Sequence, residues 1–134
     1  MKLPQLHIRD LFWLVLVVGI ATGIAAAVHV LTEQGEMIRD AYCLDWASAT
    51  VARYIDDNDG RYPPEWESLR TSFDKVTDGS FGFEEVKART IIDFRVDPMN
   101  PPTEFVTLRS GRGVRWWAPD PNDRIRERLV ASRP

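Results

Sequence analysis

The chain has 134 residues, a net charge of −3 and a single cysteine, Cys43. One cysteine excludes an intrachain disulfide and a metal site built from several cysteines. Lys2, Arg9 and Asp10 give residues 1–32 a charge of +1, so the rest of the chain carries −4. A mildly acidic soluble part argues against non-specific nucleic-acid binding, which needs a basic surface. We expect Cys43 to be a buried thiol, with an intermolecular bridge as the alternative.

A long apolar segment occupies the N-terminal part of the chain. Residues 11–31 contain no Asp, Glu, Lys or Arg. About 20 helical residues rise roughly 30 Å, which is the thickness of the hydrocarbon core of a bilayer. We therefore expect an N-terminus at 1–10, a transmembrane helix at 11–32 and an α+β domain at 33–134.

The flanks of this segment predict its orientation. Lys2 and Arg9 precede it, whereas Glu33 and Glu36 follow it. The positive-inside rule then places the N-terminus in the cytoplasm and the C-terminal domain outside. The alternative is a cleaved signal peptide with Ala25-Ala26-Ala27 at the cleavage site, which would release a small secreted domain. The apolar run is longer than a signal peptide needs, which favours an uncleaved anchor.

Small residues recur every four positions within the apolar segment. They are Gly19, Gly23 and Ala27. Such a stripe lets a second helix approach closely, which predicts association with another copy or with another membrane protein. The alternative is that glycine and alanine are simply frequent in membrane helices.

The apolar pattern after the segment predicts that the helix continues to about residue 55. One face carries apolar or small residues at helical spacing, and these are Met37, Ala41, Leu44, Ser48, Val51 and Ile55. The polar run 56–60 then predicts a turn. It does not fit a calcium loop, because Ile55 and Trp66 stand where that loop needs acidic ligands.

The remainder predicts short elements. Trp66, Leu69, Phe73 and Val76 have helical spacing, while residues 81–90 read as a short strand or irregular chain. Alternation over 92–96 predicts a strand. Residues 104–108 and 114–118 around a glycine turn predict a hairpin.

The hairpin's buried face would hold Val106, Leu108, Val114 and Trp116. Asp120 has the character of a helix N-cap, with Ile125 and Leu129 on the buried side of the last helix. The predicted fold is α+β, with the long N-terminal helix packed on a small antiparallel sheet.

This order of elements resembles the type IV pilin-like proteins, in particular the major pseudopilins of type II secretion. The motif part is 47–69, where a helix ends in tyrosine and is followed by Asp57-Asn58-Asp59-Gly60-Arg61-Tyr62-Pro63 and then by a helix with Leu69. The resemblance implies a pilin-like outer domain and a role in a cell-envelope or secretion assembly. The glycine and Phe-Thr-Leu-Ile-Glu of the family's leader-cleavage motif have no counterpart in 8–14.

The chain carries few residues for catalysis. The two histidines, His7 and His29, lie before or within the apolar segment, so the outer domain lacks a histidine base for a serine or cysteine nucleophile and a histidine ligand for zinc. We therefore expect no catalytic residue, no cofactor and no metal.

One exposed feature in the predicted hairpin suggests binding. Arg109, Arg112 and Arg115 gather there beside Trp116 and Trp117. Arginines at this density are typical of a patch for a partner or an anion, such as lipid phosphate or an acidic glycan. The alternative is a charged hairpin that protects a sheet edge. The sequence thus predicts a non-catalytic, single-pass membrane protein, with an anion- or glycan-binding module as the alternative function.

Overall fold

The computed structural model describes residues 8–97, 100–114 and 119–132. The chain divides into two compact units, Met1–Glu36 and Met37–Pro134. Helix α1 (Ile8–Asp57) provides the described part of the first unit and continues as the first helix of the second. Helices dominate the described chain, together with one two-stranded antiparallel sheet.

The first unit exposes its apolar side chains to the surroundings. Every described residue up to Gly35 is exposed, although most of the residues from Leu11 to Leu31 are apolar. The hydroxyls of Thr22 and Thr32 donate to the carbonyls of Val18 and Val28 within the same helix. Their polarity is therefore satisfied internally. Among the described residues, α1 is the helix whose length and composition suit a membrane span.

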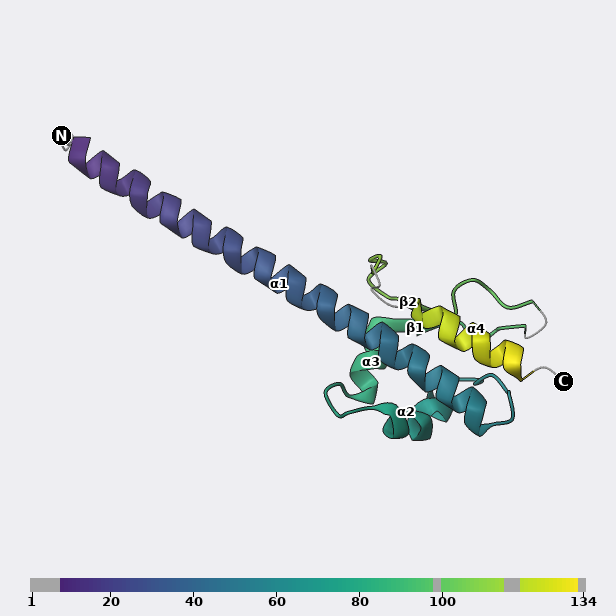
Figure 1. Cartoon of the computed structure of the whole chain (residues 1–134). Coiled ribbons are helices and arrows are strands. Elements are labelled where there is room, and N and C mark those ends of the chain that lie inside the picture. Colours follow the sequence, from purple (N-terminus) through teal and green to yellow (C-terminus); the bar gives the residue numbers. More distant parts are fainter. Residues whose placement is uncertain (1–7, 98–99, 115–118, 133–134) are drawn as a thin grey trace. The chain divides into compact units, whose positions relative to one another are not determined.

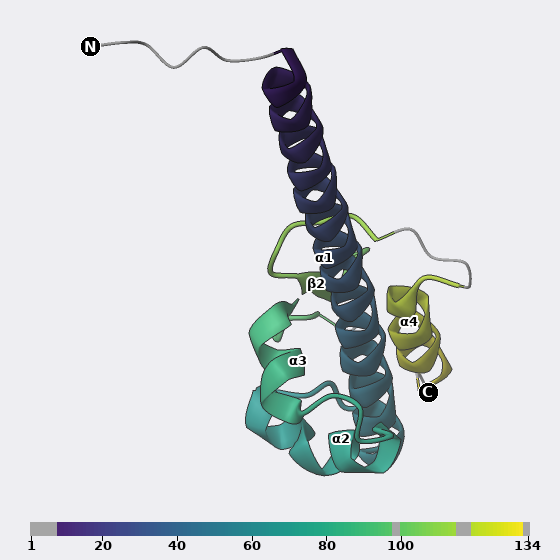
Figure 2. The same cartoon turned by 90° about the vertical axis from the view of Figure 1, so that its left-hand side faces the viewer.

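The second unit surrounds the C-terminal part of α1 with shorter elements. The helices that follow are the 3₁₀ helix η1 (Trp66–Leu69), α2 (Arg70–Val76), α3 (Phe83–Arg89) and α4 (Pro121–Ala131). Figures 1 and 2 show α2 and α3 on one side of α1 and α4 on the other. Ion pairs join α1 to both sides, from Arg39 to Glu85 of α3 and from Asp45 to Arg124 of α4.

The core of this unit is built on α1. Its buried residues include Leu44, Ala47, Val51 and Ile55, so the second half of the predicted apolar face is confirmed. Met37 at the start of that face is half exposed. Buried residues of α2, α3, α4 and both strands complete the core, together with Phe105 just before β2, and they include Phe73, Val86, Ile125 and Leu129.

The sheet pairs β1 (Thr90–Ile92) with β2 (Val106–Leu108) and corrects two predictions. The strand expected at 92–96 ends at Ile92, although Phe94 and Val96 still pack against the core. In the observed register Ile92 faces Val106, so Val96 would face Pro102, which has no amide hydrogen to donate. Among the described residues, the pairing continues only as far as the Asp93 amide, which donates to the Phe105 carbonyl at 2.9 Å, and so ends before it reaches Pro102.

The predicted hairpin between 104–108 and 114–118 is corrected in the partner that the structure shows for its first strand. Its first strand forms as β2 but pairs with β1, and Val114 lies outside any strand. Residues 115–118 are not among the described residues. Val106 and Leu108 are buried and Val114 is partly buried, as expected from the pattern.

Local signals account for the helices that flank the sheet. Residues 83–89 are helical rather than extended, with acids in the first turn of α3, bases in the last, and Phe83 and Val86 buried three positions apart. The N-cap at Asp120 is confirmed, since its side chain accepts from the backbone amide of Asn122 at 2.8 Å. The 66–76 helix is confirmed as η1 followed by α2.

Candidate functional site

The small-residue stripe of the first unit lies on an exposed helix. Gly19, Gly23 and Ala27 are four residues apart on α1, and every side chain around them is exposed. A Cβ added at either glycine would meet no atom within 4 Å. The two glycines therefore fill no packing role inside this unit, and their backbone is open to a neighbouring helix.

A buried carboxylate organises the second unit near its first residues. Asp40 of α1 is 5% exposed. Its Oδ1 accepts a hydrogen bond of 2.9 Å from Arg89 Nη1 at the end of α3, and its Oδ2 accepts one of 3.0 Å from Ser110 Oγ. A buried carboxylate is tolerated where such partners compensate its lost hydration. Asp40 thus ties α1 to both α3 and the turn after β2.

The segment that follows β2 is a tight turn bearing two arginines, and we call Arg109–Arg112 the arginine turn. The amide of Gly111 donates to the carbonyl of Leu108 at 3.0 Å, and Gly111 has a φ of 67° that suits glycine. The amide of Arg109 donates to the carbonyl of Arg89 at 2.8 Å. Together with the bond from Ser110 to Asp40, these contacts hold the turn in one conformation.

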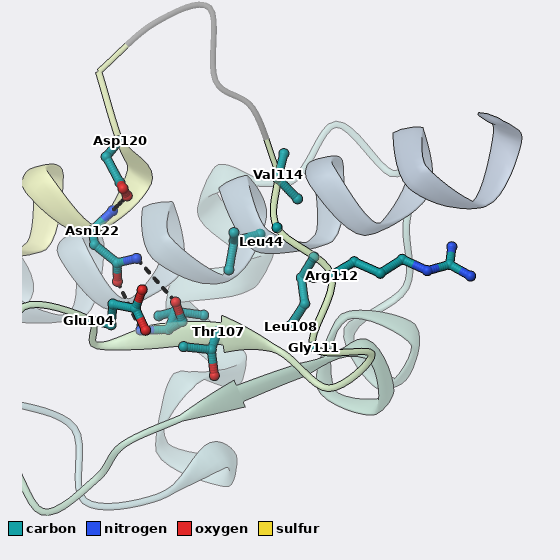
Figure 3. A pocket seen from close by; sticks show the side chains of 11 residues that line it. Leu44, Glu104, Thr107, Leu108, Gly111, Arg112, Val114, Asp120 and Asn122 are labelled. Carbon is teal, nitrogen blue, oxygen red and sulfur yellow. Dashed lines mark hydrogen bonds between the residues drawn. The ribbon is translucent and has the colours of Figure 1, made fainter. Parts of the chain in front are cut away.

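The two arginine side chains differ in their contacts. Arg109 Nε donates to the carbonyl of Ala88 at 3.0 Å. This bond orients the Arg109 side chain but leaves the two terminal nitrogens of its guanidinium available. Arg112 is exposed, and Figure 3 shows its side chain extended away from the nearby pocket. Within residues 8–97, 100–114 and 119–132, no acidic side chain forms an ion pair with either arginine.

Cys43 lies one helical turn beyond Asp40 and is completely buried. Burial raises the pKa of its thiol to about 11, and the negative charge of Glu85 adds to the rise. The buried thiol expected from the sequence is confirmed. A thiol held in its neutral form is a poor nucleophile and a poor metal ligand.

A hollow of about 450 Å³ lies between α1, β2 and the start of α4 (Figure 3). Structural hydrogen bonds engage the side chain of Asn122 in its lining. Asn122 Oδ1 accepts from the amides of Phe105 and Val106, both at 2.9 Å, and its Nδ2 donates to the carbonyl of Val106. These bonds satisfy the edge of β2 and occupy both lone pairs of the Asn122 side-chain oxygen.

The structure brings together only part of the predicted patch. Arg109 and Arg112 share one exposed turn, whereas Arg115, Trp116 and Trp117 lie outside the described residues. Sequence reasoning missed Asp40 and Ser110, which position the turn. The clue for Asp40 was its place four residues before Leu44 and seven before Ala47, on the buried face of α1.

Within the part of the chain that the structure describes, no three His, Cys, Asp or Glu side chains are grouped to hold a metal ion. No family model, curated protein or solved structure matches this chain. Its functional interpretation therefore depends on two surfaces: the exposed apolar part of α1 and the arginine turn.

Proposed function

We propose that this protein is a non-catalytic, single-pass membrane protein whose segment 11–32 anchors an extracytoplasmic domain formed by residues 33–134. The observation that carries the proposal is a contrast within α1. Its apolar side chains are exposed over the first unit, while residues of the same helix contribute to the buried core of the second. An exposed apolar surface of this length is unfavourable in water and favourable in lipid.

The proposal extends to a role as a subunit or accessory of a cell-envelope or secretion assembly, with a pilin-like outer domain. Two features support it: a helix that continues from an apolar segment into a folded domain, and the open glycines of that segment. The stripe Gly19, Gly23 and Ala27 would contact a second copy or another membrane protein in lipid. Exposed residues of α1 in the second unit, such as Ile38 and Tyr42, would extend this contact outside.

Carbonate extraction of membranes from cells that express the full chain tests the anchor. We expect the wild type to stay with the membrane. Val17→Lys combined with Ile20→Lys should shift it to the soluble fraction, because each charge near the middle of the helix costs about 3 kcal/mol. The control is Ile91→Lys with Val130→Lys, which adds the same charges at exposed positions of the second unit. A full-length wild type in the soluble fraction would contradict the proposal.

The mass of the mature chain separates the anchor from its alternatives. An intact N-terminus supports the anchor, whereas a chain that starts near Val28 indicates a secreted domain. A chain that starts near Phe12 would support processing of the prepilin kind. Alkaline phosphatase fused after Pro134 tests the orientation, since we expect it to be active outside the cytoplasm.

A further inference from the structure

The arginine turn is held rigidly at one end of the second unit. Ser110 contacts Asp40, the first buried residue of α1, and the Arg109 amide contacts the Arg89 carbonyl. The turn therefore lies beside the point where α1 enters this unit. A turn held by such bonds loses little conformational entropy when its exposed side chains bind a ligand.

The charges around the turn leave its two arginines available. Asp40 is occupied by Arg89 and Ser110. Glu85 Oε1 lies 3.5 Å from Arg39 Nε and 3.6 Å from Arg89 Nε, so Glu85 forms an ion pair with each of these arginines. The carboxylates of Asp40 and Glu85 are thus engaged with other groups, and the guanidinium groups of Arg109 and Arg112 are available to bind an anion.

The same end of the unit exposes apolar side chains. Met37 is 50% exposed and Ile38 is 58% exposed, and both precede Asp40 by three residues or fewer. Exposed apolar side chains within one helical turn of Asp40, together with the arginines of the turn, suit the boundary between lipid headgroups and water, where both kinds of group find favourable surroundings. A soluble acidic glycan would use the arginines but not the apolar residues.

Only a short length of chain joins the proposed anchor to Asp40, the residue that Ser110 of the arginine turn contacts. Asp40 lies nine positions after Leu31 on α1, and nine helical residues rise about 14 Å. An anchored segment 11–32 therefore keeps Asp40 close to the headgroup layer, which is about 5–7 Å thick on each side of the hydrocarbon core. This tether makes the local concentration of headgroups high.

We propose that the arginine turn docks on the phosphate groups of anionic lipids, with Arg109 and Arg112 as the phosphate-binding residues. Asp40 and Ser110 position the turn but do not touch the lipid. This inference depends on the proposed membrane anchor. The two arginines together favour an anionic over a neutral surface by about 30-fold, because each contributes roughly a fivefold to sixfold attraction.

The test uses the full chain in lipid nanodiscs. Gly113→Cys places a thiol next to the turn, where an added Cβ meets no atom within 4 Å. Because Cys43 is buried with a raised pKa, a maleimide fluorophore labels only the new cysteine in the folded protein. A nitroxide on the lipid headgroup then quenches the fluorophore when the turn is docked. Discs of phosphatidylcholine are compared with discs that also contain phosphatidylglycerol.

We expect phosphatidylglycerol to increase the quenching in the wild-type background and added salt to reverse the increase. Arg109→Glu with Arg112→Glu should abolish it. The matched control is Arg61→Glu with Arg95→Glu, which changes the net charge equally at exposed positions away from the turn. It should behave as the wild type.

Four outcomes would overturn the inference. The first is equal quenching in both kinds of disc, and the second is an equal loss in the control variant. The third is displacement of the turn from phosphatidylglycerol discs by inorganic phosphate or by heparin at matched ionic strength, which would identify a site for a soluble anion or an acidic glycan. The fourth is failure of the chain to enter the discs, which contradicts the proposed anchor itself and is seen before any quenching is measured.

Discussion

The carboxylate of Asp40 and the hydroxyl of Ser110 lie 3.0 Å apart although 70 residues separate them in the chain. The other oxygen of the same carboxylate binds Arg89 at 2.9 Å. One buried acid therefore connects α1, the end of α3 and the arginine turn. We regard it as the residue that gives the turn its fixed position.

Removing the charge of Asp40 should destabilise the second unit. Asp40→Asn keeps the shape but weakens the bond to partly buried Arg89, so we expect a loss of about 2 kcal/mol in the free energy of unfolding. Asp45→Asn is the control, because its pair with Arg124 is exposed and worth about 0–1 kcal/mol. Urea unfolding in detergent, followed by tryptophan fluorescence, measures both. Equal losses would show that Asp40 has no special role.

Gly60 is required for two separate reasons. It has a φ of 79°, and a Cβ at this position would overlap the side chain of Ser132 after α4. Gly60→Ala should therefore cost about 3 kcal/mol, from backbone strain and overlap together. Gly79→Ala should cost about 1 kcal/mol, because Gly79 has a φ of 84° but open space around it.

The overlap at Gly60 can be separated from the strain by a second substitution. Ser132→Gly removes the clashing Cβ, so Gly60→Ala in that background should cost no more than Gly79→Ala does in the wild type. Thermal unfolding of the four variants gives the comparison. A full cost at Gly60 in the Ser132→Gly background would refute the proposed contact with the end of α4.

Cys43 should make stability fall in alkaline solution. Its pKa is about 11 in the folded chain against an ordinary value of 9.0, so the thiolate forms first in the unfolded chain. The stabilising effect of the neutral thiol is complete below pH 9 and is lost as the pH rises to about 11, by up to about 3 kcal/mol.

Cys43→Ala isolates this effect, because burial also raises the pKa of Tyr62 and that contribution is present in both proteins. The stability of the wild type relative to Cys43→Ala should therefore decrease across this pH range. A constant difference would mean that the thiol is accessible to water in the folded protein. Slow labelling of Cys43 by iodoacetamide under native conditions is an independent check.

The small-residue stripe predicts association within the membrane. Gly19→Ile with Gly23→Ile should lower self-association in a membrane two-hybrid assay, because the larger side chains keep the two backbones apart. Ala21→Ile with Ala25→Ile is the matched control on a different face of α1. If both pairs leave the assay unchanged, the stripe plays no part in self-association.

Local patterns predicted the helices well and the strand pairing poorly. The N-cap at Asp120 and the helical spacing of Leu69 and Phe73 depend on neighbours within one or two turns, and the structure confirms them. The partner of β2 depends instead on which strand the tertiary structure places within hydrogen-bonding distance of its backbone. Its observed partner, β1, lies 14 to 18 positions earlier in the chain, so neighbours along the sequence do not select it.

The candidate site shows the same division. The presence of Arg109 and Arg112 around a glycine turn follows from the sequence, whereas their support by Asp40 does not. The spacing of Asp40 from Leu44 and Ala47 indicated its helix face, but a charged residue normally faces water, and the sequence did not indicate that Arg89 and Ser110 would be its partners.

By itself the sequence determined the length and apolarity of residues 11–31, the helical periods and the helix cap, because these depend on side chains close together in the chain. The tertiary structure alone decided that β1 pairs with β2, that Asp40 is buried, and that the arginine turn is held beside α1. These features depend on contacts between residues that are distant in the sequence. Such contacts form, and stabilise the fold, only when the whole core packs.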